Sequence, residues 1–222
     1  LGLRRQRRRR YDDEHEQLHE WGNRAALTEP GPDPLAIPAL FAAQVVRAPE
    51  ALALVCGDRS WTYRELDETA NRLAHLLAAE GAAPGETVAL LIPRSGEAIM
   101  AILAVLKTGA AYLPIDPAHP DDRISFMLSD AAPLAAVTTD DLRARLDGTG
   151  VSVIDIHDPA IAGQPATALE MPAPDHLAYM TYTSGTTGRP KAVAVTHHNV
   201  TQLVAGLHAD LPAGPGQVWS QW

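Results

Sequence analysis

Hydrophobic and polar positions follow two alternating patterns along most of the chain. Short apolar runs recur, and longer stretches between them place apolar residues three or four positions apart. The first pattern is typical of buried strands and the second of amphipathic helices. Together, the two patterns predict strands at residues 51–57, 86–93, 110–116, 133–139, 151–156, 176–183 and 192–197, and helices at residues 38–49, 60–81, 95–109, 120–131 and 140–148.

The stretch 60–81 carries the clearest helical signals in the chain. Thr62 and Glu65 have the spacing of a capping box, and Gly81 is suited to end the helix. One face is apolar, and we expect it to be buried; it consists of Leu66, Ala70, Leu73 and Leu77.

The regular alternation of strands and helices predicts the fold class. Strands separated by helices of this length favour βαβ units, in which neighbouring strands run parallel. We therefore expect an α/β protein built from alternating βα units around a mostly parallel sheet.

Composition is compatible with such a fold and excludes some other classes. The 222 residues are 46% hydrophobic and 20% charged, which is ordinary for a globular protein. A net charge of -9 argues against non-specific nucleic-acid binding. The longest apolar run, residues 99–106, is too short to cross a membrane. Cys56, the single cysteine, is expected to be a small core residue in a reducing compartment, so we predict a cytoplasmic protein.

The first 34 residues differ in composition from the rest of the chain. Six of the first ten are arginines, acidic residues follow, and a proline-rich stretch precedes Pro34. This is typical of a linker, so we assign residues 1–34 as a charged, Pro-rich linker and residues 35–222 as the compact part. Nucleic-acid contact by the arginines is the less favoured alternative, because the neighbouring acids partly neutralise them.

A loop after the predicted strand 176–183 contains the candidate chemistry. Its residues are hydroxyl-bearing or glycine, and a lysine follows. Backbone N–H groups, side-chain hydroxyls and the lysine ammonium could therefore together bind phosphate. The candidate binding residues are Thr183, Ser184, Gly185, Thr186, Thr187, Gly188 and Lys191. A Walker loop is excluded, since Pro190 and Ala192 replace its second glycine and its serine or threonine. From composition alone, a Ser/Thr/Gly turn without function remains an alternative.

Three stretches in order resemble adenylate-forming enzymes. "YTSGTTGRPKAVAVTH" resembles their signature loop. "WTYRELDETANRLAHLL" and "LKTGAAYLPIDPAHPDDRISFML" are similar to two core motifs of the adenylation domains of nonribosomal peptide synthetases, with Trp61 where leucine is usual. "HEQLHEWGNRAA" looks like the linker from a condensation domain. The resemblance covers nearly all of the chain after the arginines.

The resemblance implies the N-terminal part of the adenylation domain, a partial N-terminal subdomain that is truncated at residue 222. The whole enzyme would use ATP and Mg²⁺ to activate an amino acid as aminoacyl-AMP and load it onto the phosphopantetheine thiol of a carrier domain. An upstream condensation domain and a downstream carrier domain would be its partners. The loop and Lys191 would hold the β- and γ-phosphates. No catalytic acid, base or metal ligand would lie in this stretch, and we expect it to be inactive alone.

Two other functions remain as alternatives. Within the superfamily, the chain is also compatible with part of an acyl-CoA synthetase or an aryl-acid ligase. Separately, His15, Glu16 and His19 match the H-E-x-x-H zinc-protease pattern. We regard that match as accidental, because no strand or core precedes His15 to orient a zinc site. The pair His197 and His198 is expected to pack locally beside the phosphate site.

Overall fold

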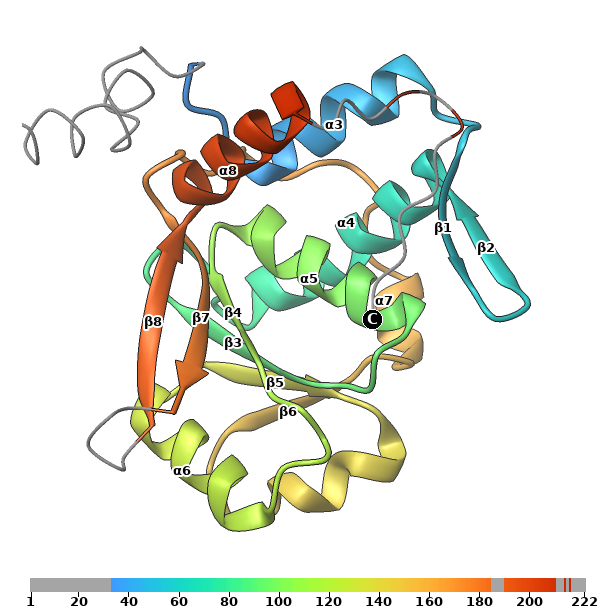
Figure 1. Cartoon of the computed structure of the whole chain (residues 1–222). Coiled ribbons are helices and arrows are strands. Elements are labelled where there is room, and N and C mark those ends of the chain that lie inside the picture. The colour runs from blue at the N-terminus through green and yellow to red at the C-terminus, as the bar shows by residue number, and fades with distance from the viewer. Residues whose placement is uncertain (1–32, 185–189, 211–213, 215, 217–222) are drawn as a thin grey trace, which may run out of the picture. The chain divides into compact units, whose positions relative to one another are not determined.

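The computed structural model describes residues 33–184, 190–210, 214 and 216 (Figure 1). The chain divides into two units, Leu1–Asp33 and Pro34–Trp222, and all described helices and strands belong to the second. The helices are α3 (Ile37–Arg47), α4 (Tyr63–Ala79), α5 (Gly96–Thr108), α6 (Asp121–Ala131), the 3₁₀ helix η1 (Asp140–Leu146), α7 (Pro159–Ala162) and α8 (His197–Asp210). The strands are β1 (Leu52–Cys56), β2 (Arg59–Thr62), β3 (Thr87–Leu91), β4 (Ala111–Pro114), β5 (Ala135–Thr138), β6 (Ser152–Asp155), β7 (Leu177–Thr183) and β8 (Lys191–Thr196).

The main sheet has six strands in the order β6-β5-β3-β4-β7-β8. The first five strands in this order are parallel to one another, and β8 runs antiparallel to β7. This confirms the prediction of an α/β fold with a mostly parallel sheet. The strand order shows that β3 lies between β4 and β5, although β4 and β5 both follow it in the sequence.

Helices cover both faces of the sheet, and alternate residues of β3 separate the two cores. Val88 and Leu90 pack with apolar residues of α4 and α5. Ala89 and Leu91 pack on the other side with α6 and η1. In Figure 1, α4 and α5 accordingly lie on one face of the sheet and α6 on the other. The successive helices α5 and α6 therefore leave the sheet in opposite directions.

The helix α4 follows its sequence signals closely. Thr62 and Glu65 form the capping box, with Thr62 Oγ1 accepting from Glu65 N at 3.2 Å and Glu65 Oε2 accepting from Thr62 N at 2.8 Å. The predicted apolar face is buried at all four positions, Leu66, Ala70, Leu73 and Leu77. Gly81, with φ of 102°, takes the left-handed conformation just after the helix.

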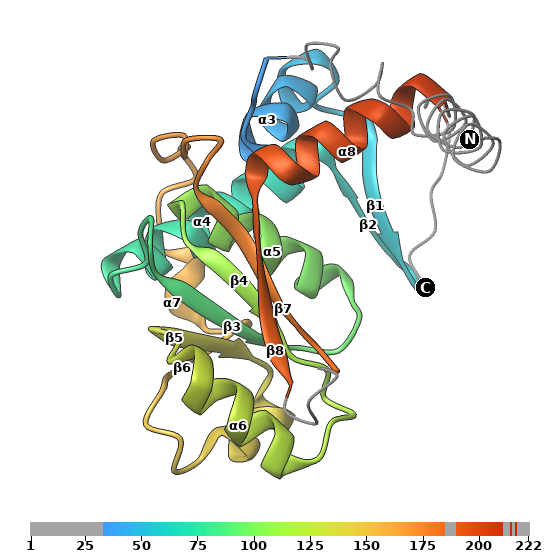
Figure 2. The same ribbon diagram turned by 60° about the vertical axis from the view of Figure 1, so that its left-hand side comes forward.

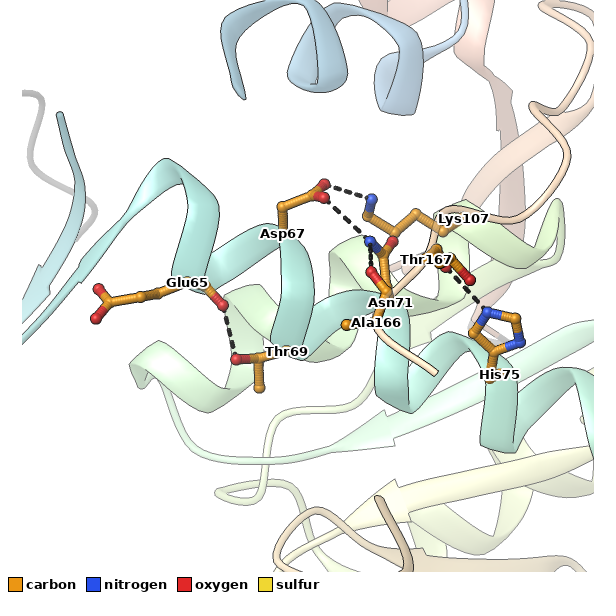
Figure 3. Close-up of polar contacts among 8 residues, drawn as sticks. All are labelled: Glu65, Asp67, Thr69, Asn71, His75, Lys107, Ala166 and Thr167. Atoms are coloured by element: carbon orange, nitrogen blue, oxygen red, sulfur yellow. Dashed lines mark hydrogen bonds and ion pairs between the residues drawn. The ribbon is translucent and has the colours of Figure 1, made fainter. Parts of the chain in front are cut away.

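Polar residues of α4 attach it to α5 and to Ala166 and Thr167 in the connection after α7 (Figure 3). Asp67 accepts a hydrogen bond from the buried Lys107 of α5 at 2.7 Å and one from Asn71 at 3.0 Å. Asn71 also donates to the carbonyl of Ala166 at 2.8 Å, and a ring nitrogen of His75 lies 2.9 Å from the carbonyl oxygen of Thr167. These contacts fix the connection that leads from α7 towards β7.

Several expectations were wrong at the edges of the fold. The run 51–57 is not a buried strand, because β1 pairs only with β2 in a separate two-stranded hairpin and stays largely exposed. Cys56 is therefore an exposed residue and not a core residue. Residues 59–62 form β2, so the helix predicted from residue 60 begins only after Thr62. The predicted helix 140–148 is a 3₁₀ helix, and α7 and α8 were not predicted.

Candidate functional site

A cleft opens where the parallel strands β3 and β4 end. The chain leaves β3 for α5 on one face and leaves β4 for α6 on the other, so the two loops diverge. Such a divergence is the topological switch point at which open α/β sheets bind ligands. The cleft has a volume of about 480 Å³. Its lining is mostly apolar and comes from β3, β4, α5, α6 and the end of β7: Leu90, Ile92, Pro93, Arg94, Ser95, Ala98, Ile99, Ile102, Pro114, Ile115, Asp116, Pro117, His119, Met127, Thr181 and Tyr182.

Hydrogen bonds fix both loops at the rim of the cleft. On the β3 side, the Ser95 hydroxyl caps α5 by accepting from the backbone N–H of Ala98 at 3.2 Å. On the β4 side, Asp116 accepts from the backbone N–H of Ala118 at 2.8 Å. Arg145 then donates to Asp121 at 2.8 Å and to the carbonyl of His119 at 2.7 Å. Asp116, which precedes Pro117, therefore serves the turn, and Asp121, which follows Pro120, serves the first turn of α6.

Three of the candidate phosphate-binding residues, Thr183, Ser184 and Lys191, meet at the end of the β7–β8 hairpin, beside this cleft. Thr183 ends β7, and it pairs in register with Lys191, which begins β8. The Thr183 hydroxyl lies 3.5 Å from the Lys191 carbonyl oxygen, and both residues and Ser184 are exposed. Two hydroxyl donors and an ammonium on one exposed end of a hairpin fit an anionic ligand such as phosphate. Gly185, Thr186, Thr187 and Gly188 lie outside the described residues.

Tyr182 connects the phosphate-loop end of β7 to α6. Its hydroxyl donates to the Asp130 carboxylate at 2.6 Å, and its ring meets Phe126 edge-on at 6.1 Å between centroids. Burial raises the pKa of Tyr182, and the hydrogen bond and negative charge of Asp130 raise it further. The phenol therefore stays protonated and remains a donor at physiological pH. No sequence signal indicated this contact, since Tyr182 and Asp130 are 52 residues apart.

His197 lies at the opposite end of β8 from the phosphate loop. It begins α8 and is buried, so the expectation of a position on a strand beside the phosphate site was wrong. Its Nδ1 accepts from the backbone N–H of Ile37 at 3.3 Å, which attaches α8 to α3; the two helices lie side by side in Figures 1 and 2. Burial lowers the pKa of His197 to about 4, with a smaller contribution from His176. The role of His197 in this structure is packing.

The described residues contain no candidate site for a metal ion held by protein side chains. No group of three or more His, Cys, Asp or Glu side chains in that part of the chain is arranged to hold a metal ion. His15, Glu16, His19 and the arginine run lie outside the described residues. Of the helices that the structure describes, none combines the length and apolar character needed to span a membrane.

The fold and the site together define a class: an α/β domain in which β7 and β8 flank a hydroxyl- and glycine-rich sequence, and β7 ends beside the cleft. The family model of AMP-binding enzymes matches residues 41–221. The chain belongs to this family of adenylate-forming enzymes, and it corresponds to the N-terminal part of an adenylation domain of the nonribosomal peptide synthetase type.

Similar proteins are much longer than this chain. The isonitrile lipopeptide synthase of Mycobacterium tuberculosis is 61% identical over 208 residues, which are 94% of this chain and 8% of that protein. The dimodular nonribosomal peptide synthase of Bacillus subtilis is 43% identical over 182 residues, which are 79% of this chain and 8% of that protein. A crystal structure of the nonribosomal peptide synthetase FmoA3 in an α-methyl-L-serine-AMP bound form has a TM-score of 0.77 and 33% identity, over 85% of this chain and 20% of that one.

Proposed function

We propose that this chain supplies the phosphate-binding part of an enzyme domain that activates an amino acid with ATP. The observation that carries the proposal is the convergence of Thr183, Ser184 and Lys191 at the carboxyl end of β7, beside the switch-point cleft. Gly185, Thr186, Thr187 and Gly188 would complete the loop. The matched family and the peptide synthetases among the similar proteins support the same assignment.

In the proposed reaction, a carboxylate oxygen of the amino acid attacks the α-phosphorus of ATP. The new O–P bond forms aminoacyl-AMP while the bond from the α-phosphorus to the bridging oxygen breaks and pyrophosphate leaves. Lys191 would balance negative charge on the β- and γ-phosphates, and the hydroxyls of Thr183 and Ser184 would orient them. Mg²⁺ would be bound mainly by the phosphate oxygens. These residues bind and orient, and none of them acts as an acid or a base.

The wider assignment follows from the proposed reaction. The acyl group would pass from AMP to the phosphopantetheine thiol of a downstream carrier domain. Residues 1–34 would serve as the linker from an upstream condensation domain, and a synthetase of this kind would be cytoplasmic. An acyl-CoA synthetase or aryl-acid ligase is the second candidate, because the description of the matched family, AMP-binding enzymes, is not limited to peptide synthetases.

Titration of the 222-residue chain with pyrophosphate and with ATP in the presence of Mg²⁺ tests the proposal. We expect binding of both, and Lys191→Ala should weaken it roughly tenfold, because a charge-assisted contact to phosphate is lost. Arg47→Ala is the matched control, since Arg47 is an exposed cation at the end of α3 and not on the hairpin. Absence of pyrophosphate binding, or equal losses in both variants, would contradict the proposed function.

A further inference from the structure

The loop end of the β7–β8 hairpin extends past the residue of β7 that pairs in register with β4. Among the described residues, the ladder between β4 and β7 has a single register pair, Tyr112 with Tyr179. Pairing between β7 and β8, by contrast, continues as far as Thr183 with Lys191. The last residues of β7 are thus bound to β8 but extend beyond their paired contact with β4. Contacts of Tyr182 with α6 also hold this end against the body of the domain.

The helix α6 provides a rigid surface for that purpose. Its apolar face, Ile124, Met127 and Leu128, is buried against the sheet. Met180 and Tyr182 are two residues apart and so lie on the same face of β7, and both pack against the same core. Tyr182 is the one nearer to the loop, and it adds the hydrogen bond to Asp130 at 2.6 Å and the edge-on contact with Phe126. In Figures 1 and 2, the loop end of the hairpin lies beside α6.

We propose that Tyr182 is a positioning residue for phosphate binding, which it supports by holding the end of β7 against α6 through Asp130. The inference rests on the proposed function, because it assigns to Thr183 and Ser184 the phosphate contacts whose placement Tyr182 controls. Thr183 is the next residue after Tyr182, and Ser184 follows Thr183. A displacement of Tyr182 would therefore shift the backbone that carries both hydroxyls. A contact to phosphate weakens steeply when its donor is displaced.

Binding of inorganic pyrophosphate to the 222-residue chain, measured by calorimetry, tests this role. Tyr182→Phe removes the hydroxyl and keeps the ring, and we expect roughly fivefold weaker binding, since the lost hydrogen bond had a charged acceptor. Asp130→Ala should weaken binding by a similar factor, and Asp130 is exposed, so this change leaves the core intact. Asp130→Asn keeps an acceptor oxygen and should restore most of the affinity.

Two further measurements separate positioning from a general loss of stability. Tyr179→Phe is the matched control, because Tyr179 lies on the same strand but its ring packs on Tyr112 at 5.4 Å between centroids. It should bind pyrophosphate as the unchanged chain does. In a double-mutant cycle, Tyr182→Phe combined with Asp130→Ala should bind no more weakly than either single variant, because both remove the same hydrogen bond.

The outcomes distinguish this inference from the proposed function. If the unchanged chain binds pyrophosphate and Tyr182→Phe binds equally well, or no worse than Tyr179→Phe, the positioning role is refuted and the proposed function stands. Additive losses in the double variant would also refute it. If the unchanged chain binds no pyrophosphate, the proposed function fails and the inference fails with it.

Discussion

Gly96 and Trp61 offer a direct test of how the β1–β2 hairpin is attached to α5. Gly96 is the first residue of α5, and a Cβ placed there would lie 2.5 Å from Cη2 and 2.7 Å from Cζ3 of the Trp61 ring. A shift of the ring would also disturb the contacts that it makes with Arg59. The Arg59 guanidinium lies 4.5 Å from its centroid and forms an ion pair with Glu97 of α5. Gly96→Ala therefore forces either the indole or the helix to shift.

The expected cost follows from the size of this overlap. Extra methyl groups in well-packed sites typically cost about 1–3 kcal/mol, and the approach here is shorter than real Cβ contacts allow. We expect Gly96→Ala to lower the free energy of unfolding by about 2 kcal/mol. In a Trp61→Leu background the six-membered ring is gone, so the same change should cost close to nothing. The coupling energy of the pair is then about 2 kcal/mol.

Urea unfolding of the four proteins of this cycle, followed by circular dichroism, measures the coupling. Gly206→Ala is the control for replacing glycine itself, because a Cβ at this position in α8 meets nothing within 4 Å. It should leave stability unchanged or raise it by up to about 1 kcal/mol, as helix propensity predicts. An equal cost of Gly96→Ala with Trp61 and with leucine would refute the steric reasoning.

Three other changes test the buried polar groups and the helix cap. Between pH 6.5 and about 4, His197 is protonated in the unfolded chain but not in the folded chain, so the free energy of unfolding falls as the pH falls, by up to about 3 kcal/mol. The difference in the free energy of unfolding between His197→Gln and the unchanged chain should therefore shrink as the pH falls through this range, and a constant difference would contradict the assignment. Asp67→Ala should cost about 3 kcal/mol in urea unfolding, because Lys107 is left buried without its partner, whereas Lys107→Met should cost less, so equal losses would speak against this reading. Thr62→Ala removes the cap of α4 and should cost about 1 kcal/mol in thermal unfolding, with no loss expected if the cap is unimportant.

Apolar periodicity predicted the central strands of the main sheet and the helix α4 well because they bury one side or both. The α4 face predicted from spacing is buried at Leu66, Ala70, Leu73 and Leu77, and Val88 to Leu91 of β3 are buried on both faces. The strand β1 was wrongly predicted to be buried because its apolar composition resembles that of the buried strands. Leu52 and Val55 have the composition of a buried strand but are 57% and 56% exposed, because their strand pairs outside the main sheet. Composition cannot tell which sheet a strand joins.

The candidate site was predictable only in part. The loop itself stands out by composition, since hydroxyls, glycines and Lys191 follow one another in a short stretch. Its surroundings could not be predicted from local pattern. The cleft lies between loops that leave the sheet on opposite faces because β3 lies between β4 and β5. The anchor from Tyr182 to Asp130 joins residues 52 positions apart. Both depend on strand order, which periodicity does not contain.

In the proposed phosphate site, the antiparallel β8 gives a reason for the role assigned to a lysine side chain. In a Walker loop the chain continues into a helix, whose N-terminus adds a positive partial charge to the phosphate site. Here β7 is followed by the strand β8, so the chain after the loop does not open a helix, and the first residue of β8 returns beside Thr183. In the proposed role, Lys191 would then carry most of the charge balance from an exposed position. Screening by salt acts strongly on such an exposed charge, so pyrophosphate affinity should fall steeply with ionic strength, and Lys191→Ala should remove most of that dependence.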